Sequence, residues 1–167
     1  MNQLTGFGSR HFSIAMYIAN RPDFAHYPKL AKLQPLGNGE IRHIIAHTGN
    51  HWRKIFNVYA KFMAALKSVD SSVSVDWRHY RDNYLLQSHS DEVLLFSPPD
   101  FNALNTVHIV AGKTYAAQLQ LTSIVWLDRY FAVDPARRLI VCTYPDYRQL
   151  SDQRIKQLIQ LVREIGA

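Results

Sequence analysis

The sequence predicts a single α/β domain over residues 1–167, a three-layer α/β/α sandwich around a mostly parallel four-stranded central sheet. Three observations lead to this fold class. The chain has the length of one domain, and 47% of its residues are apolar against 19% charged, which is typical of a globular protein. Apolar runs of strand length alternate with segments of helical periodicity. One run, within "HIVAGKTYAAQL", passes through a glycine directly into a helical segment, as in sheets covered by helices.

Four apolar runs are predicted to form the sheet, at residues 12–19, 92–96, 106–111 and 139–143. The first, "FSIAMYIA", is apolar at nearly every position, which is typical of a central strand covered on both faces. The second is followed by a Pro-Pro pair at 98–99, and proline cannot continue a strand ladder. We therefore expect abrupt strand ends that are followed by loops.

The predicted helices cover residues 40–47, 50–67 and 75–86, a segment from Lys113 onward, and the chain after Ser151. In the helix over 50–67, Thr48 is the expected N-cap. Apolar side chains recur there at helical spacing and predict one buried face: Trp52, Ile55, Phe56, Tyr59, Met63 and Leu66. Residues 20–39 read as a long loop, and residues 122–132 fit neither a strand nor a helix clearly.

The stretch "HIVAGKTY" ends in Gly-Lys-Thr, the last letters of a phosphate-binding loop. That loop requires an earlier glycine five positions before Gly112, where its backbone wraps the phosphates, and Val107 stands there instead. The motif therefore does not predict a nucleotide hydrolase. It predicts that Gly112 provides the backbone angles for a sharp turn from strand to helix.

Charge and cysteine content bound the class of partner and the compartment. The formal net charge is +6 and the pI about 9.5, which favours acidic partners such as nucleic acid. The basic residues are spread along the chain, however, and this spread favours a solvated basic surface over a binding patch. The single cysteine, Cys142, lies within an apolar run and reads as a buried small side chain. No signal peptide or membrane-length run is evident. We expect a cytoplasmic protein without membrane contact, cofactor or metal.

Candidate catalytic residues follow the ends of the predicted strands, because ligands bind beyond the carboxyl ends of parallel strands. Asn20 and Asp23 follow the first strand, and Asp146 follows the last. Two carboxylates on neighbouring strand ends could activate water or hold a metal ion. The alternative is that Asp23 and Asp146 each cap a turn after a proline.

Candidate ligand-binding residues lie near the same strand ends. At the start of the helix over 50–67 they are Asn50, His51, Trp52 and Arg53, where free N–H groups attract anions and the tryptophan could stack on a base. A capped helix with Trp52 in the core is the alternative. Tyr144, Tyr147 and Arg148 could form a wall that stacks on bases and contacts phosphate, or could pack at the core edge. Lys113 is expected to face the strand-end cleft or solvent.

The layout resembles the uracil-DNA glycosylase superfamily over nearly the whole chain. The strings that carry the resemblance are "IANRPDF", "HTGNHWRKIF", "VLLFSPPDF", "HIVAGKTYAAQL" and "VCTYPDYRQL". The chain is also similar to a small uncharacterised bacterial family. The glycosylase resemblance implies a ligand site at the strand ends. It also implies that Ser97 replaces the family's asparagine, and that Tyr144-Pro145-Asp146 replaces its His-Pro-Ser. The family's catalytic motifs are thus replaced, and the fold alone does not carry its activity.

These observations predict a glycosylase-like protein that binds nucleic acid or a nucleotide-like, phosphate-bearing small molecule at the strand ends. They leave open whether it is an enzyme. The alternative prediction is a non-catalytic protein-interaction module, for which a homodimer is one arrangement. The sequence has no Gly-x-Ser-x-Gly elbow, and its one cysteine lies within a strand, so serine and cysteine hydrolases are disfavoured.

Overall fold

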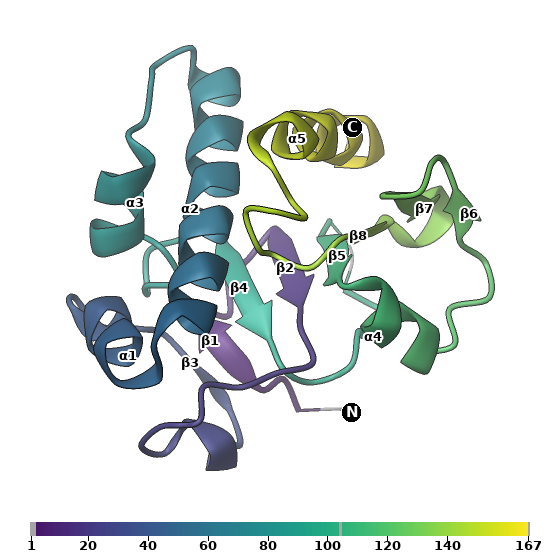
Figure 1. Cartoon of the computed structure of the whole chain (residues 1–167). Helices are drawn as coiled ribbons and strands as arrows, with labels where there is room; N and C mark the ends of the chain where they lie inside the picture. Colours follow the sequence, from purple (N-terminus) through teal and green to yellow (C-terminus); the bar gives the residue numbers. More distant parts are fainter. Residues whose placement is uncertain (1–2, 104, 167) are drawn as a thin grey trace.

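The computed structural model describes residues 3–103 and 105–166, and it has the α/β architecture that the sequence predicts (Figure 1). The strands are β1 (Gly6–Gly8), β2 (Ile14–Tyr17), β3 (Leu33–Gln34), β4 (Glu92–Leu95), β5 (Val107–Ala111), β6 (Val125–Trp126), β7 (Ala132–Asp134) and β8 (Leu139–Cys142). The helices are α1 (Glu40–Thr48), α2 (Asn50–Ser71), α3 (Trp77–Asn83), α4 (Lys113–Gln118) and α5 (Asp152–Gly166), with 3-10 turns at Tyr27–Lys29 and Pro135–Arg137.

The four predicted strands are present as β2, β4, β5 and β8, and they lie side by side in the order β4-β2-β5-β8 with parallel pairing throughout. Ile14 of β2 pairs with Glu92 on one side and Val107 on the other. Every residue of these strands is buried, which explains why they read as continuous apolar runs.

The predicted four-stranded sheet is nevertheless wrong in size and direction, because the sheet has eight strands and is mixed. On one side β1 pairs antiparallel with β4 and parallel with β3, and on the other β7 pairs antiparallel with β8 and β6. These four strands contain only two or three residues each, too few to show a periodicity. In β1 glycine is required by packing, since a Cβ on Gly6 would lie 2.1 Å from the Leu94 carbonyl oxygen.

The helices follow the predicted segments with shifted ends. α2 runs on to Ser71, and α3 is shorter than the segment predicted over 75–86. Thr48 is not the N-cap of α2: it is the last residue of α1, and its hydroxyl donates to the Ile44 carbonyl oxygen at 2.7 Å. Gly49, with φ +82°, separates the two helices. None of the helices within the described ranges is both long and apolar enough to cross a lipid bilayer.

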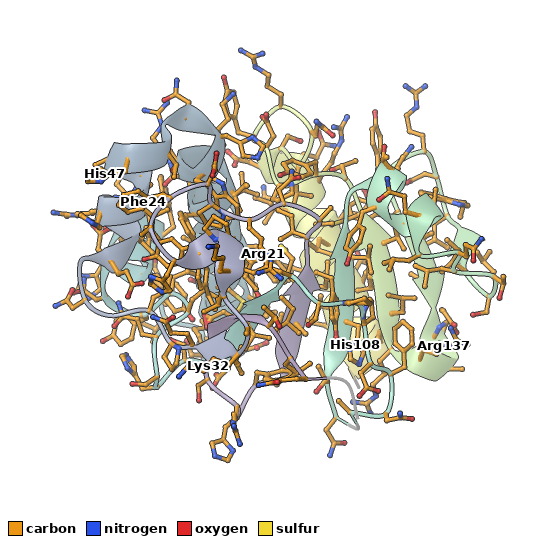
Figure 2. The ribbon with its side chains drawn as sticks, turned by 90° about the horizontal axis from the view of Figure 1, so that it is seen from below. Arg21, Phe24, Lys32, His47, His108 and Arg137 are labelled. Carbon is orange, nitrogen blue, oxygen red and sulfur yellow. The ribbon has the colours of Figure 1, made fainter. Side chains whose placement is uncertain are left out.

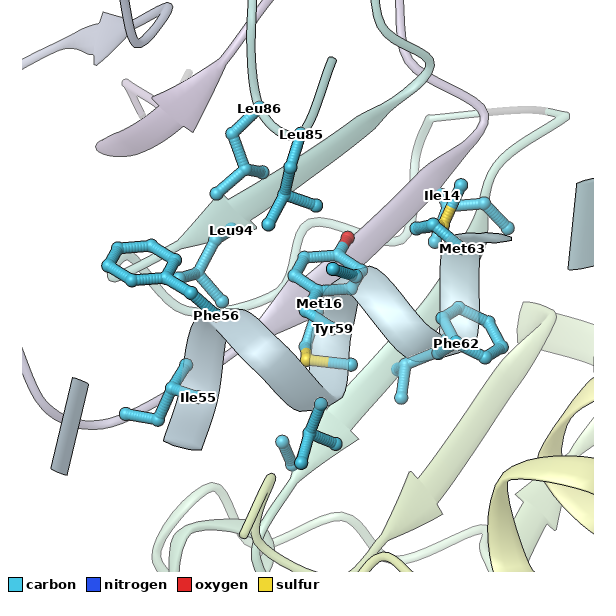
Figure 3. Close-up of a cluster of buried hydrophobic side chains, with 14 of the residues drawn as sticks. Ile14, Met16, Ile55, Phe56, Tyr59, Phe62, Met63, Leu85, Leu86 and Leu94 are labelled. Carbon is cyan, nitrogen blue, oxygen red and sulfur yellow. The ribbon is translucent and has the colours of Figure 1, made fainter. Parts of the chain in front are cut away.

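The larger core lies between one face of the sheet and helices α1, α2, α3 and α5 (Figures 1 and 3). The apolar face predicted for α2 is buried there, and the Tyr59 hydroxyl also donates to the Val93 carbonyl oxygen at 2.8 Å. Figure 3 shows α2 crossing over the sheet, with Phe56 beside Leu94 of β4 and Met63 beside Ile14 of β2. This packing fixes the start of α2 close to the strand ends.

The second core covers the opposite face of the sheet with α4 and loops. Ala116 of α4 packs there against the strand residues Val110 and Val141. Phe101, from the loop between β4 and β5, covers the buried His108, and the Arg137 guanidinium lies over the Phe101 ring (Figure 2). Helices therefore leave the sheet toward opposite faces after β2 and after β5.

Candidate functional site

A cleft of about 460 Å³ lies at the carboxyl ends of β2, β5 and β8. The chain turns toward one face of the sheet after β2 and toward the other after β5, and these strands are neighbours. Such a reversal opens a crevice between adjacent strand ends, where α/β proteins bind ligands. The cleft has the size of a small-molecule site. It is lined by Ala19, Asn20, Ala111, Gly112, Lys113, Thr114, Tyr115, Gln118, Thr143, Tyr144 and Gln149.

The Tyr144 hydroxyl joins three distant parts of the chain at this cleft. The Asn20 amide donates to it at 2.9 Å, and it lies 3.0 Å from Nε2 of His51 in the first turn of α2. Burial raises the pKa of Tyr144 above its ordinary value, while the Asn20 hydrogen bond lowers it, so the phenol remains protonated near neutral pH. A hydroxyl that accepts from Asn20 has its own proton free for His51 or for a ligand.

The Thr143 side chain leaves a buried polar atom without a partner beside this chain of hydrogen bonds. Thr143 is 7% exposed, and its Oγ1 has no hydrogen-bond partner among the described residues. Buried hydroxyls in folded proteins are nearly always hydrogen-bonded, because an unpaired one costs free energy. Thr143 lines the cleft, but its Oγ1 has less than 1 Å² of exposed surface, so a ligand there reaches this hydroxyl only when the side chain rotates toward the cleft.

Gly112 makes the turn from β5 into α4, as predicted. Its φ is +110°, a backbone angle that side-chain-bearing residues rarely adopt. A Cβ there would meet only the Tyr144 ring, at 3.5 Å, so the backbone angle and not crowding requires glycine. Lys113 follows and is exposed, and its Nζ lies 5.1 Å from the centroid of the Trp126 ring. The cleft thus has a cation at its edge beside an exposed tryptophan.

The residues predicted at the start of α2 divide between surface and core. Asn50, His51 and Arg53 are exposed, and His51 reaches Tyr144. Trp52 is 3% exposed and packs on Phe56 and Phe96, so the prediction that it stacks on a base is wrong. Helical spacing had placed Trp52 on the apolar face of α2, and that reading holds.

The predicted carboxylate pair does not follow neighbouring strands, because β5 lies between β2 and β8. Asp23 is exposed in the loop after β2. Asp146 accepts from the backbone N–H of Arg148 at 2.9 Å and lies 3.7 Å from the Lys54 ammonium. Asp146 therefore caps a turn, which was the alternative reading.

Three further predicted residues lie outside the cleft. The Ser97 hydroxyl accepts from the backbone N–H of Thr5 at 3.1 Å and so joins the segment before β1 to the end of β4. Tyr147 is 50% exposed, with the Lys54 ammonium 5.5 Å and the Arg148 guanidinium 5.6 Å from its ring centroid. Tyr147 and Arg148 form a basic, aromatic surface near Asp146.

Sequence reasoning missed Thr143 and the amides Gln118 and Gln149 as parts of the site. Thr143 had a signal, since it is a polar residue that ends the apolar run "LIVCT". The glutamines had none, because their place in the cleft depends on how α4 and the loop after β8 turn. The histidine stacked on Phe24, His47, lies in α1 away from the cleft lining (Figure 2).

Two more buried titratable groups lie away from the cleft. Glu92, at the start of β4, accepts a hydrogen bond from the Tyr80 hydroxyl, and burial raises its pKa to about 7. His108 lies 2.7 Å from the Tyr17 hydroxyl through Nδ1, and burial lowers its pKa. Neither group lines the cleft, and both are buried in the interior of the protein.

Comparison with known proteins gives a family match over most of the chain. The model of a family of unknown function, DUF6942, matches residues 5–163. No curated protein and no solved structure matches the chain. These comparisons do not link the chain to the uracil-DNA glycosylases, and that resemblance stays a prediction.

Proposed function

We propose that this chain, which belongs to the DUF6942 family of unknown function, binds a small nucleotide-like anion in the cleft at the carboxyl ends of β2, β5 and β8. The observation that carries the proposal is the buried, unpartnered Thr143 hydroxyl in the wall of this cleft. A ligand that hydrogen-bonds to Thr143 would remove the free-energy cost of that unpaired group.

The lining supports a ligand with several polar groups. Asn20, Gln118 and Gln149 bring amides, and Tyr144 and Thr143 bring hydroxyls. Amides and hydroxyls can both donate and accept, as the edges of a base and the hydroxyls of a sugar require. A purely apolar ligand would leave these groups unpaired, which disfavours it.

Charge near the cleft supports a phosphate group on this ligand. Lys113 lines the cleft, and His51, outside the lining, lies beside Tyr144. When the His51 Nε2 carries a hydrogen, it can donate to Tyr144, and the Tyr144 proton is then available to a phosphate oxygen. The exposed ring of Trp126 beside Lys113 offers a surface for base stacking.

Binding, and not base excision, is the function that the geometry supports. The carboxylates that a hydrolytic step would use, Asp23 and Asp146, follow strands separated by β5, and Asp146 caps a turn. Nucleic acid stays a candidate ligand only through a single nucleotide that enters the cleft, since the cleft volume is that of a small-molecule site.

Isothermal titration calorimetry with a nucleoside monophosphate, the matching nucleoside and inorganic phosphate tests this proposal. We expect the monophosphate to bind most tightly, and its affinity to fall as salt rises because charge contributes. Tyr144→Phe removes the hydroxyl that links Asn20 and His51 and should weaken binding about tenfold, roughly the effect of losing one charge-assisted hydrogen bond. Tyr147→Phe, outside the cleft, is the matched control.

Two results would contradict the proposal. One is the absence of binding by the monophosphate, the nucleoside and phosphate alike. The other is equal loss of affinity in Tyr144→Phe and Tyr147→Phe, which would place the ligand on the basic surface around Tyr147 instead of in the cleft.

A further inference from the structure

An apolar groove of about 670 Å³ runs between α2, α3 and α5, on the helical side of the molecule. Its floor contains Ala64 and Ala65 of α2 with Ile155 and Ile159 of α5. The two alanines are small, so they leave the space that longer side chains would fill. Val69, 45% exposed, forms part of the wall. No residue lines both this groove and the strand-end cleft, so the groove is a separate surface.

Cations surround the tryptophan of this groove. The Trp77 ring, which is half-buried, has the Arg78 guanidinium 4.5 Å, the Lys61 ammonium 5.2 Å and the Arg81 guanidinium 5.5 Å from its centroid. Lys156 of α5 adds a further exposed cation to the lining.

One acid opposes these cations within the groove lining, and outside the lining Arg81 is paired with Asp82 at 2.9 Å. Asp152 lies 3.7 Å from the Lys61 ammonium, and its side chain is 84% exposed, so solvent screens this ion pair. The groove is therefore apolar along its floor and basic at its rim.

The shape and charge of the groove select its occupant. A concave apolar strip between helices fits the apolar face of an amphipathic helix, which anchors through side chains on one face. A basic rim favours acidic residues beside that face, because complementary charge raises affinity and on-rate. A second copy of the chain that presented this same groove would place cations against cations, which is unfavourable.

We infer that the groove between α2, α3 and α5 binds an acidic amphipathic helix of a partner protein. The leucine-type side chains of the helix lie on Ala64, Ala65 and Ile159, beside the Trp77 ring, and its carboxylates pair with Lys156 and Arg78 at the rim. This interaction does not depend on the nucleotide-like ligand of the strand-end cleft.

Fluorescence anisotropy of labelled peptides with the full-length chain tests this inference. The probe is a designed helical peptide with leucines at i, i+3, i+4 and i+7 and glutamate elsewhere, and its partner probe has lysine at each glutamate position. We expect the acidic peptide to bind at about micromolar concentrations and the lysine peptide at least about tenfold more weakly. Added salt should weaken binding of the acidic peptide only.

Two exposed valines of neighbouring sequence give matched variants. Val69→Glu places a negative charge in the groove wall and should weaken binding of the acidic peptide at least about tenfold. Val73→Glu, at a side chain that is 63% exposed and outside the groove lining, should change the affinity for the acidic peptide less than about twofold. Both positions are exposed, so neither substitution should disturb folding, and circular dichroism checks this.

Three results would overturn the inference. The first is that neither peptide binds at concentrations up to about 100 µM, because a Kd above that value is weaker than a specific helix site requires. The second is equal binding of the acidic and lysine peptides, or equal loss in the two valine variants. The third is saturable binding of a fatty acid such as laurate, blocked by Val69→Glu, with no binding of the acidic peptide, since the groove would then be a site for small anionic amphiphiles.

Discussion

Replacing Thr143 by valine should stabilise the free protein and weaken its ligand binding at the same time. Valine has nearly the shape of threonine but carries a methyl group where threonine has its hydroxyl. Because the Thr143 hydroxyl is buried and has no partner among the described residues, its loss removes a desolvation cost and not a hydrogen bond.

The expected gain follows from the burial of that hydroxyl. An unpaired buried polar group costs about 1–3 kcal/mol, so the free energy of unfolding should rise by about that amount in Thr143→Val. In a domain of this size each kcal/mol raises Tm by about 2–4 °C. Urea denaturation and calorimetry measure both quantities in ligand-free protein.

A second threonine supplies the control. The Thr48 hydroxyl donates to the Ile44 carbonyl oxygen at 2.7 Å, so Thr48→Val loses a hydrogen bond and should not stabilise the protein. Binding of the nucleoside monophosphate should weaken about tenfold or more in Thr143→Val and stay unchanged in Thr48→Val. A Thr143→Val protein that is less stable than the wild type would refute the reasoning, because it would mean that the hydroxyl is already satisfied. Greater stability with unchanged binding would refute its role in the site.

Three other substitutions test separate parts of the structure. Gly112→Val should lower the free energy of unfolding by about 1–3 kcal/mol because φ is +110° at this position. Gly37→Ala is the control and should change that free energy little, since a Cβ there meets only an ordinary contact at 3.6 Å. Equal effects of the two substitutions in urea denaturation would be inconsistent with backbone strain at Gly112. Lys113→Ala, at an exposed residue, should change Tm by no more than about 2–4 °C, yet it should weaken binding of the monophosphate and reduce the salt dependence of that binding in calorimetric titration. An unchanged affinity would argue against a phosphate beside Lys113. Glu92→Gln should abolish a pH dependence of the free energy of unfolding. The folded-state pKa of Glu92, about 7, lies above its ordinary value, so the stability of the wild type relative to the variant should be highest at and below about pH 4.5 and should fall by up to about 3 kcal/mol as pH rises to 7. A constant difference in stability across this range would contradict this expectation.

The parallel strands could be predicted from the sequence because burial on both faces makes each one a continuous apolar run, as in Leu139–Cys142. The short edge strands could not. Val125–Trp126 is exposed and two residues long, so neither burial nor periodicity marks it. Gly6–Gly8 is a three-residue strand with two glycines, a residue type that is depleted in strands, and these glycines serve a close approach to β4.

That side chains from several strand ends lie together could be predicted, because the ends of parallel strands meet at one edge of the sheet. Asn20, Lys113 and Tyr144 do line one cleft. The pairing of Asp23 with Asp146 failed because it required a strand order that the sequence does not specify. The partners within the site depend on packing, which composition and spacing do not determine.

The place of β2 in the sheet has a consequence for the order of folding. β2 is among the first elements of the chain, yet Ile14 pairs with Glu92 and Val107, which are far later in the sequence. Contacts between residues so distant along a chain slow folding, because a long loop must close before they form. During synthesis the apolar strand Ile14–Tyr17 stays without partners until β4 and β5 have emerged. We therefore expect slow, late assembly of the sheet, with helices α1 to α3 forming before its central strand is enclosed.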